Sequence, residues 1–258
     1  MKRVLSLFLG SFLLCSTSFA ELKTQTVEYK DGTTALEGYL AYDDSFTGKR
    51  PGVLVVHEWN GLGHYAQGRC DQLAKLGYVA FAADIYGKGV RPATADEAKT
   101  ESGKFYADRK LLRARVNAGL NQLEKNELVD TTKVAAIGYC FGGTTVLELG
   151  RSGANIKGIV SFHGGLGNPS PADDKNIKAK LLVCQGGADK FTLGDVPAFK
   201  KSLKDAKVDF KFVSYPGAVH GFTNPENTGS MPGVKYDAKA DKGSWKEMMA
   251  FFKKIFKG

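Results

Sequence analysis

Short apolar strands alternate with helical segments along most of this chain, and this alternation limits the possible folds more than any other feature. The run Val53-Leu54-Val55-Val56 is typical of a strand that is buried on both faces of a sheet. Two alternating segments before it, 22–29 and 36–42, flank a turn at 31–33 and predict an antiparallel hairpin. Further strands are predicted at residues 79–83, 134–137, 156–162, 180–185 and 209–215.

Helical spacing of apolar residues separates these strands. Helices are predicted at residues 65–76, 95–127, 144–149 and 196–206, and an apolar stripe from Trp245 to Phe256 predicts a closing helix. A hairpin followed by repeated strand–helix units indicates an α/β fold, with a mainly parallel sheet and helices on both of its faces. We find no repeat or linker that divides it, and we expect one domain over residues 21–258.

The first twenty residues are typical of a secretory signal peptide. Lys2 and Arg3 precede an apolar run, 4–14, that is too short to span a bilayer, and Ser18-Phe19-Ala20 offers a cleavage site before Glu21. We therefore expect an exported protein, periplasmic or secreted, without stable membrane insertion. The net charge of +9 comes from scattered lysines, which argues for a solvated basic surface and against a nucleic-acid partner.

The strongest chemical signal is the G-x-C-x-G motif at residues 138–142. It lies between a predicted strand and a predicted helix, which is the nucleophile-elbow arrangement of the α/β-hydrolase fold, with Cys140 in the position of the usual serine. The turn is so tight that side chains at Gly138 and Gly142 would collide with neighbouring backbone. A sulfur at a helix N-terminus is also favoured as a thiolate. Cys140 is the predicted nucleophile.

An acid and a base are expected after later strands, in the chain order nucleophile, acid, histidine. Asp189 follows the strand at 180–185, and His220 follows the strand at 209–215. Both lie at carboxyl ends of strands, where open α/β sheets bind their ligands. Three other acids compete with Asp189 from positions further from a strand end: Asp173, Asp174 and Asp195.

The loop after the strand at 53–56 contains His57-Glu58-Trp59-Asn60. In this fold the loop supplies one oxyanion-hole N–H and the residue after the nucleophile supplies another, which predicts the backbone N–H groups of Trp59 and Phe141. Glu58 would then project toward Cys140. A carboxylate there could accept a proton from a thiol, although a solvated loop residue is the alternative.

Two other cysteines would remain after signal cleavage, which makes three with Cys140. Cys184 lies in a predicted buried strand and Cys70 on a predicted helix, so both are interpreted as small apolar core residues. An odd number of cysteines leaves at least one free thiol. A disulfide between Cys70 and Cys184 is an alternative that nothing in the sequence supports.

Taken together, these motifs resemble the dienelactone hydrolase family over nearly the whole mature chain. The resemblance rests on His57-Glu58, on Asp84-Ile85-Tyr86-Gly87, on the segment 138–143, on Asp189 and on His220-Gly221-Phe222. It implies a Cys-His-Asp triad that hydrolyses lactones or related esters, with the glutamate helping to activate the thiol. The family holds a substrate carboxylate with arginines. Here Lys88 and Arg91 are the candidates near the first arginine position, and no arginine follows His220.

Two other classes of protein compete with this interpretation. Gly61-Leu62-Gly63, with Asp84 at the end of the next predicted strand, mimics a dinucleotide-binding motif, but four residues separate Gly61 from the preceding strand. A non-catalytic exported binding protein on a hydrolase scaffold would have no need of the complete set Cys140, Asp189 and His220. We expect a small-molecule substrate, no cofactor and no metal, because no two histidines have the spacing of metal ligands.

Overall fold

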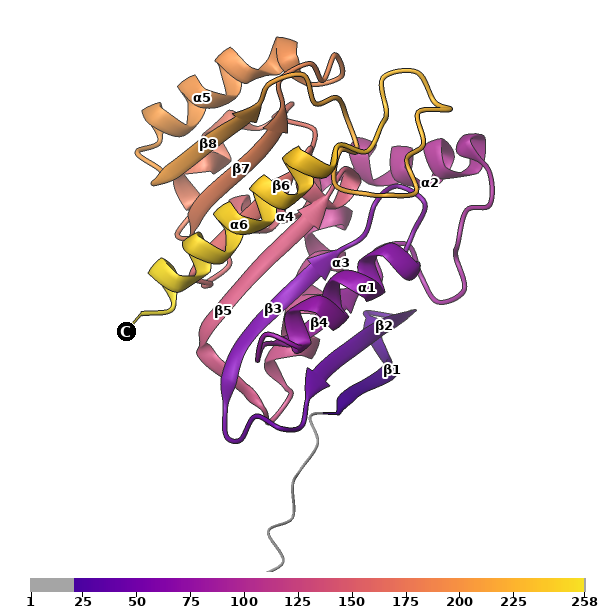
Figure 1. The fold of residues 1–258 in the computed structure, drawn as a ribbon, viewed down its shortest axis with the longest axis vertical. Coiled ribbons are helices and arrows are strands. Elements are labelled where there is room, and N and C mark those ends of the chain that lie inside the picture. The colour runs from indigo at the N-terminus through magenta and orange to yellow at the C-terminus, as the bar shows by residue number, and fades with distance from the viewer. Residues whose placement is uncertain (1–20, 258) are drawn as a thin grey trace, which may run out of the picture.

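The computed structural model describes residues 21–257, in which one eight-stranded sheet forms the centre of the molecule (Figure 1). The strand order is β1-β2-β4-β3-β5-β6-β7-β8. The strands are β1 (Leu22–Asp31), β2 (Thr34–Asp43), β3 (Arg50–Val56), β4 (Val79–Ala83), β5 (Val129–Tyr139), β6 (Gly158–Phe162), β7 (Lys180–Gly186) and β8 (Phe210–Tyr215). The β1–β2 hairpin and the β2–β4 pair are antiparallel, and every other pair is parallel. The predicted mainly parallel sheet with an N-terminal hairpin is confirmed. The predicted signal peptide, 1–20, lies outside the described residues.

Helices cover both faces of the sheet, as predicted. They are α1 (His64–Ala74), α2 (Ala95–Ala107), α3 (Arg109–Glu124), α4 (Phe141–Arg151), α5 (Val196–Asp205) and α6 (Ala238–Ile255). Helices α1 and α6 pack on one face, and α3, α4 and α5 lie on the other. Successive residues of β3 alternate between the two cores, with Val53 and Val55 in one and Leu54 and Val56 in the other. This alternation explains the uninterrupted apolar sequence of the strand.

The prediction of a single helix over residues 95–127 is wrong, because the helix is interrupted at Asp108 and the segment forms α2 and α3. That residue has φ −119° and ψ 88°, so it ends α2, and its carboxylate accepts a hydrogen bond from the N–H of Leu111 at 2.9 Å. Asp108 is therefore the N-cap of α3, a position that favours aspartate. In the part of the chain that the structure describes, no helix is long and apolar enough to cross a membrane.

Candidate active site

Cys140 lies in a strained turn between β5 and α4. Its φ is +53°, a left-handed conformation that non-glycine residues rarely adopt. The two flanking glycines make the turn possible. A Cβ at Gly138 would lie 2.0 Å from the carbonyl oxygen of Gly142, and a Cβ at Gly142 would lie 2.2 Å from the carbonyl oxygen of Val56. Such strain is typical of functional positions, and it turns residue 140 out of the sheet at the N-terminus of α4.

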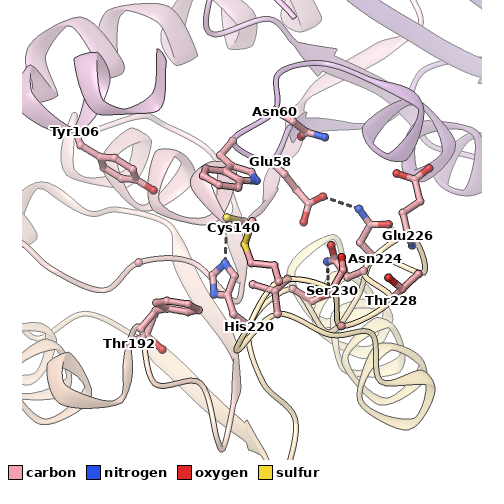
Figure 2. A pocket seen from close by; sticks show the side chains of 18 residues that line it. Glu58, Asn60, Tyr106, Cys140, Thr192, His220, Asn224, Glu226, Thr228 and Ser230 are labelled. Carbon is pink, nitrogen blue, oxygen red and sulfur yellow. Dashed lines mark hydrogen bonds between the residues drawn. The ribbon is translucent and has the colours of Figure 1, made fainter. Parts of the chain in front are cut away.

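The predicted nucleophile, base and acid form one hydrogen-bonded series, of which Figure 2 shows the contact between Cys140 and His220. His220 Nε2 lies 3.1 Å from Cys140 Sγ, and His220 Nδ1 lies 2.9 Å from Asp189 Oδ2. Asp189 is fully buried and also accepts a hydrogen bond from the N–H of Phe191 at 3.0 Å. The carboxylate therefore holds the imidazole with Nδ1 protonated and Nε2 directed at the sulfur.

The acids that competed with Asp189 lie elsewhere. Asp173 accepts a hydrogen bond from Arg113 Nη1 at 2.7 Å, and Asp174 accepts one from Arg151 Nε at 2.8 Å. Asp195 is in the short 3-10 helix η2 (Leu193–Asp195). Among these carboxylates, Asp189 is the one that the structure brings to His220.

The electrostatics of the site favour a charged His220. Burial disfavours the imidazolium, but the negative charge of a Cys140 thiolate and the hydrogen bond to Asp189 outweigh it and raise the pKa of His220 to about 10. At neutral pH His220 is therefore an imidazolium, with Nε2 3.1 Å from the sulfur of Cys140. An imidazolium in this position stabilises negative charge on the sulfur and can protonate a leaving group.

Two backbone donors are free near the sulfur. Trp59 lines the same cavity as Cys140, and Phe141 is the first residue of α4. Within residues 21–257, neither N–H donates to a protein acceptor. Unpaired N–H groups beside a nucleophile are what an oxyanion hole requires, so the structure is compatible with the predicted donors.

Glu58 lies on the cavity wall, but its carboxylate does not bond to the sulfur. Glu58 Oε2 accepts a hydrogen bond from Asn224 Nδ2 at 2.7 Å, and Figure 2 shows the carboxylate turned toward this amide. Burial raises the pKa of Glu58, although the bond to Asn224 and the charge of His220 oppose the shift. A carboxylate with a raised pKa is a stronger base than an exposed one.

His57 explains how Glu58 reaches this position. Its Nε2 accepts the N–H of Ile85 at 3.3 Å, which leaves the proton on Nδ1, and Nδ1 donates to the Glu58 carbonyl oxygen at 2.6 Å. Burial lowers the pKa of His57 to about 4, so the ring is neutral and keeps this tautomer. The histidine fixes the backbone of Glu58 and takes no direct part in the triad.

A second buried histidine connects the nucleophile to the loop of the base. The N–H of Cys140 donates to His163 Nδ1 at 3.1 Å, and His163 Nε2 lies 2.7 Å from Thr223 Oγ1. Thr223 Oγ1 also lies 2.6 Å from Tyr65 Oη. Burial and the nearby His220 lower the pKa of His163 well below its usual range, which keeps the ring neutral. The sequence does not predict this network, since a histidine at a strand end does not show which residue it will contact.

The cavity at Cys140 has a volume of about 580 Å³. Its lining contains two carboxylates, those of Glu58 and Glu226. The other titratable lining residues in the described part of the chain are Tyr106, Cys140 and His220. The substrate-binding residues predicted from the resemblance do not line it. Lys88 pairs with Glu28, and Arg91 lies 3.7 Å from Asp84. Each of these two cationic side chains therefore lies next to a carboxylate outside the cavity lining.

The remaining cysteines, the candidate dinucleotide motif and the metal-ligand question can each be compared with the structure. Cys70 and Cys184 are free and buried, and burial raises the pKa of both thiols, that of Cys184 to about 12. The carboxylate of Asp84 is occupied by the backbone N–H groups of Glu37, Tyr86 and Gly87 and is not open to a ribose. Over residues 21–257 no three His, Cys, Asp or Glu side chains are grouped as metal ligands.

A mainly parallel sheet with a nucleophile elbow after β5 defines this chain as an α/β-hydrolase. A sequence model of the dienelactone hydrolase family matches residues 36–256, and the chain belongs to that family. The resemblance seen in the sequence is confirmed, and with it a hydrolase of the lactone and ester type.

Individual relatives match over most of their length. Protein usf of Aquifex pyrophilus is 30% identical over 89% of this chain and 97% of its own. A solved structure named m3DLH is 37% identical with a TM-score of 0.88, and the match covers 91% of this chain and 99% of that one. A dienelactone hydrolase-like promiscuous phosphotriesterase from metagenomic libraries is 38% identical with a TM-score of 0.87, covering 91% and 98%.

Proposed function

We propose that this chain hydrolyses uncharged lactones or carboxylic esters through an acyl-thioester on Cys140. The observation that carries the proposal is the hydrogen-bonded series from Cys140 through His220 to Asp189, at the wall of one cavity. The three residues come from three separate loops, so packing of a single element does not account for their alignment. A binding module would not require it either.

The proposed reaction begins with attack of the Cys140 thiolate on the carbonyl carbon. The N–H groups of Trp59 and Phe141 stabilise the resulting oxyanion. When the intermediate collapses, the imidazolium of His220 gives its Nε2 proton to the leaving alkoxide, and a thioester remains. Neutral His220 then takes a proton from water as the water attacks the thioester. The acid is released and the thiolate–imidazolium pair is restored.

Glu58 is the proposed second base in this scheme. It would accept the proton of any Cys140 that is present as the thiol, after its carboxylate rotates away from Asn224. The buried position of Glu58 and its raised pKa support this role, because both increase its proton affinity.

The charges in the cavity support an uncharged substrate. Glu58 and Glu226 would repel a substrate carboxylate, and the lining residues include no lysine or arginine to bind one. A charged hydrogen bond from such a residue would contribute roughly 1.5–3 kcal/mol. We therefore expect kcat/KM for a neutral lactone to exceed that for its carboxylate-bearing counterpart, such as dienelactone.

Turnover of p-nitrophenyl acetate tests the function. We expect turnover by the wild-type protein, a loss of several orders of magnitude in kcat for Cys140→Ala and a large loss for His220→Ala, each with an unchanged circular dichroism spectrum. An unreactive wild-type protein would favour a non-catalytic binding role. A dienelactone kcat/KM far above that of matched neutral lactones would contradict the proposed charge preference.

We also propose that the chain is exported and that cleavage after Ala20 leaves Glu21 as the mature N-terminus. The support is the signal pattern of residues 1–20, together with a first strand that starts at Leu22. N-terminal sequencing of protein purified from a cell that expresses the full chain tests this. A protein that keeps Met1 would contradict the proposal.

A further inference from the structure

Half of the large apolar side chains that are exposed to solvent in the described residues line the cavity. The described residues include six of them: Phe46, Leu76, Tyr106, Phe191, Leu193 and Met231. Tyr106, Phe191 and Met231 line the cavity, and Leu193 follows Phe191 by two residues. The three lining residues come from α2, the loop after β7 and the loop after His220. Their convergence is therefore a property of the site and not of one amphipathic element.

These side chains continue an apolar wall that begins at the catalytic base. Phe191 is 61% exposed, and its ring meets the ring of His220 edge-on, with 5.5 Å between the centroids. Trp59 and Val234 add further apolar surface to the lining. Exposed apolar surface gathered around a cavity is typical of a binding site for an apolar group.

The size of the cavity also favours a substrate with a large apolar group. About 580 Å³ is within the range of cavities that hold drug-sized ligands, and a single small lactone ring would fill only part of it. Cys140, Phe191 and Met231 all line this volume. A substrate with a longer apolar part would remove both its own surface and that of Phe191 and Met231 from water.

We propose that the cavity binds an uncharged ester with an extended apolar acyl or alcohol group, and that Phe191 and Met231 determine this specificity. The inference rests on the proposed function and narrows its substrate class. The apolar group lies along the wall formed by these two side chains when the ester carbonyl is at Cys140. The carboxylates of Glu58 and Glu226 disfavour anionic substrates of the same length.

Two ester series test the proposal on the mature protein. In the acyl series, p-nitrophenyl acetate is compared with p-nitrophenyl octanoate; in the alcohol series, methyl acetate is compared with octyl acetate. Each methylene that leaves water contributes about a fourfold increase in binding when it is fully buried, and about half of that effect at an open cavity. We therefore expect kcat/KM to rise at least about 30-fold with length in one series, mainly through KM.

Substitutions of apolar lining residues test which side chains cause the preference for longer esters. Met231→Ser should reduce the ratio of long-chain to short-chain kcat/KM about tenfold, and Met231→Leu should retain it. Leu76→Ser is the matched control, since Leu76 is 50% exposed and does not line the cavity. It should leave the ratio unchanged. Thermal unfolding of each variant shows whether it is folded.

The outcomes separate this inference from the proposed function. If the wild-type protein hydrolyses no ester, or if Cys140→Ala retains activity, the proposed function fails. If the wild-type protein hydrolyses short and long esters with similar kcat/KM in both series, the proposed function stands and the apolar specificity is wrong. A length preference that Met231→Ser and Phe191→Ser leave unchanged would also refute the assignment of these two residues.

Discussion

Replacing Glu58 with glutamine should make the protein more stable and less active. Glu58 is 7% exposed, and its burial raises the pKa of the carboxyl group above the value in the unfolded chain, which is about 4.3. The stability that such an acid contributes is complete below the unfolded pKa and is lost as pH rises through the folded pKa. Wherever the pH exceeds the unfolded pKa, this shift therefore lowers the free energy of unfolding, by up to about 1.4 kcal/mol for each unit of pKa difference.

Glutamine removes this cost and keeps the contact that orients the side chain. Its amide oxygen can accept the hydrogen bond that Asn224 Nδ2 now donates at 2.7 Å. Glu58→Gln should thus raise the urea midpoint at pH 7, with a gain that disappears as the pH approaches 4. The same change removes a base, so the acylation rate should fall by roughly 10²–10⁴-fold, the usual loss for general-base catalysis. Deacylation depends on His220 and should change much less.

Stopped-flow measurement of the p-nitrophenol burst separates the two chemical steps. Glu58→Gln should slow the burst and leave hydrolysis of a preformed acyl-enzyme nearly unchanged. The matched control is Glu124→Gln, because burial also raises the pKa of Glu124, which is outside the cavity. The control variant should also raise the urea midpoint at pH 7, and it should leave the rate of the p-nitrophenol burst unchanged. A Glu58→Gln burst within about twofold of wild type would show that His220 alone activates the thiol.

Three further predictions follow from the geometry of the site. Iodoacetamide at neutral pH should label Cys140 first, because the other two described cysteines are buried; peptide mapping that finds the fast adduct on either of them would refute this. Thr223→Val should lower the free energy of unfolding in urea by about 1–3 kcal/mol for each buried group left without a partner, and should slow alkylation of Cys140; an unchanged rate would mean that the network does not position the nucleophile. For an ester with a poor leaving group, kcat/KM should fall as the pH rises through about 10, where His220 loses its proton. Asp189→Asn should shift this fall in kcat/KM to lower pH. An unshifted pH profile would refute the contribution of Asp189 to the raised pKa of His220.

The fold and the juxtaposition of Cys140, Asp189 and His220 could be predicted because their signals are local in the sequence. Each parallel strand is a short apolar run, and the carboxyl ends of such strands share one edge of a sheet. Cys140, Asp189 and His220 each follow a strand within a few residues, so the topology alone brings them to that edge. The break at Asp108 was missed because the apolar spacing on either side still fits one helical face.

The cavity could not be predicted because it depends on contacts between distant loops. Glu58 and Asn224 are 166 residues apart in the sequence, and His163 and Thr223 are 60 apart. Whether such side chains meet depends on the path of each loop, which no short pattern encodes. The same reason explains Lys88, whose position in the sequence suggested substrate binding but whose side chain pairs with Glu28.

The arrangement of charges explains why a thiol suits this site better than a hydroxyl would. Against the lowering effect of burial, a negative charge at residue 140 and the hydrogen bond to Asp189 raise the pKa of His220, and a cysteine thiol gives up its proton more readily than a serine hydroxyl. A nearby carboxylate such as Glu58 would disfavour an oxyanion, so it is useful only where the nucleophile has a proton to give up. In the proposed reaction the cavity therefore combines a thiol nucleophile, two carboxylates and an apolar part of its lining. Each of these disfavours anionic substrates, and together they favour attack on a neutral carbonyl.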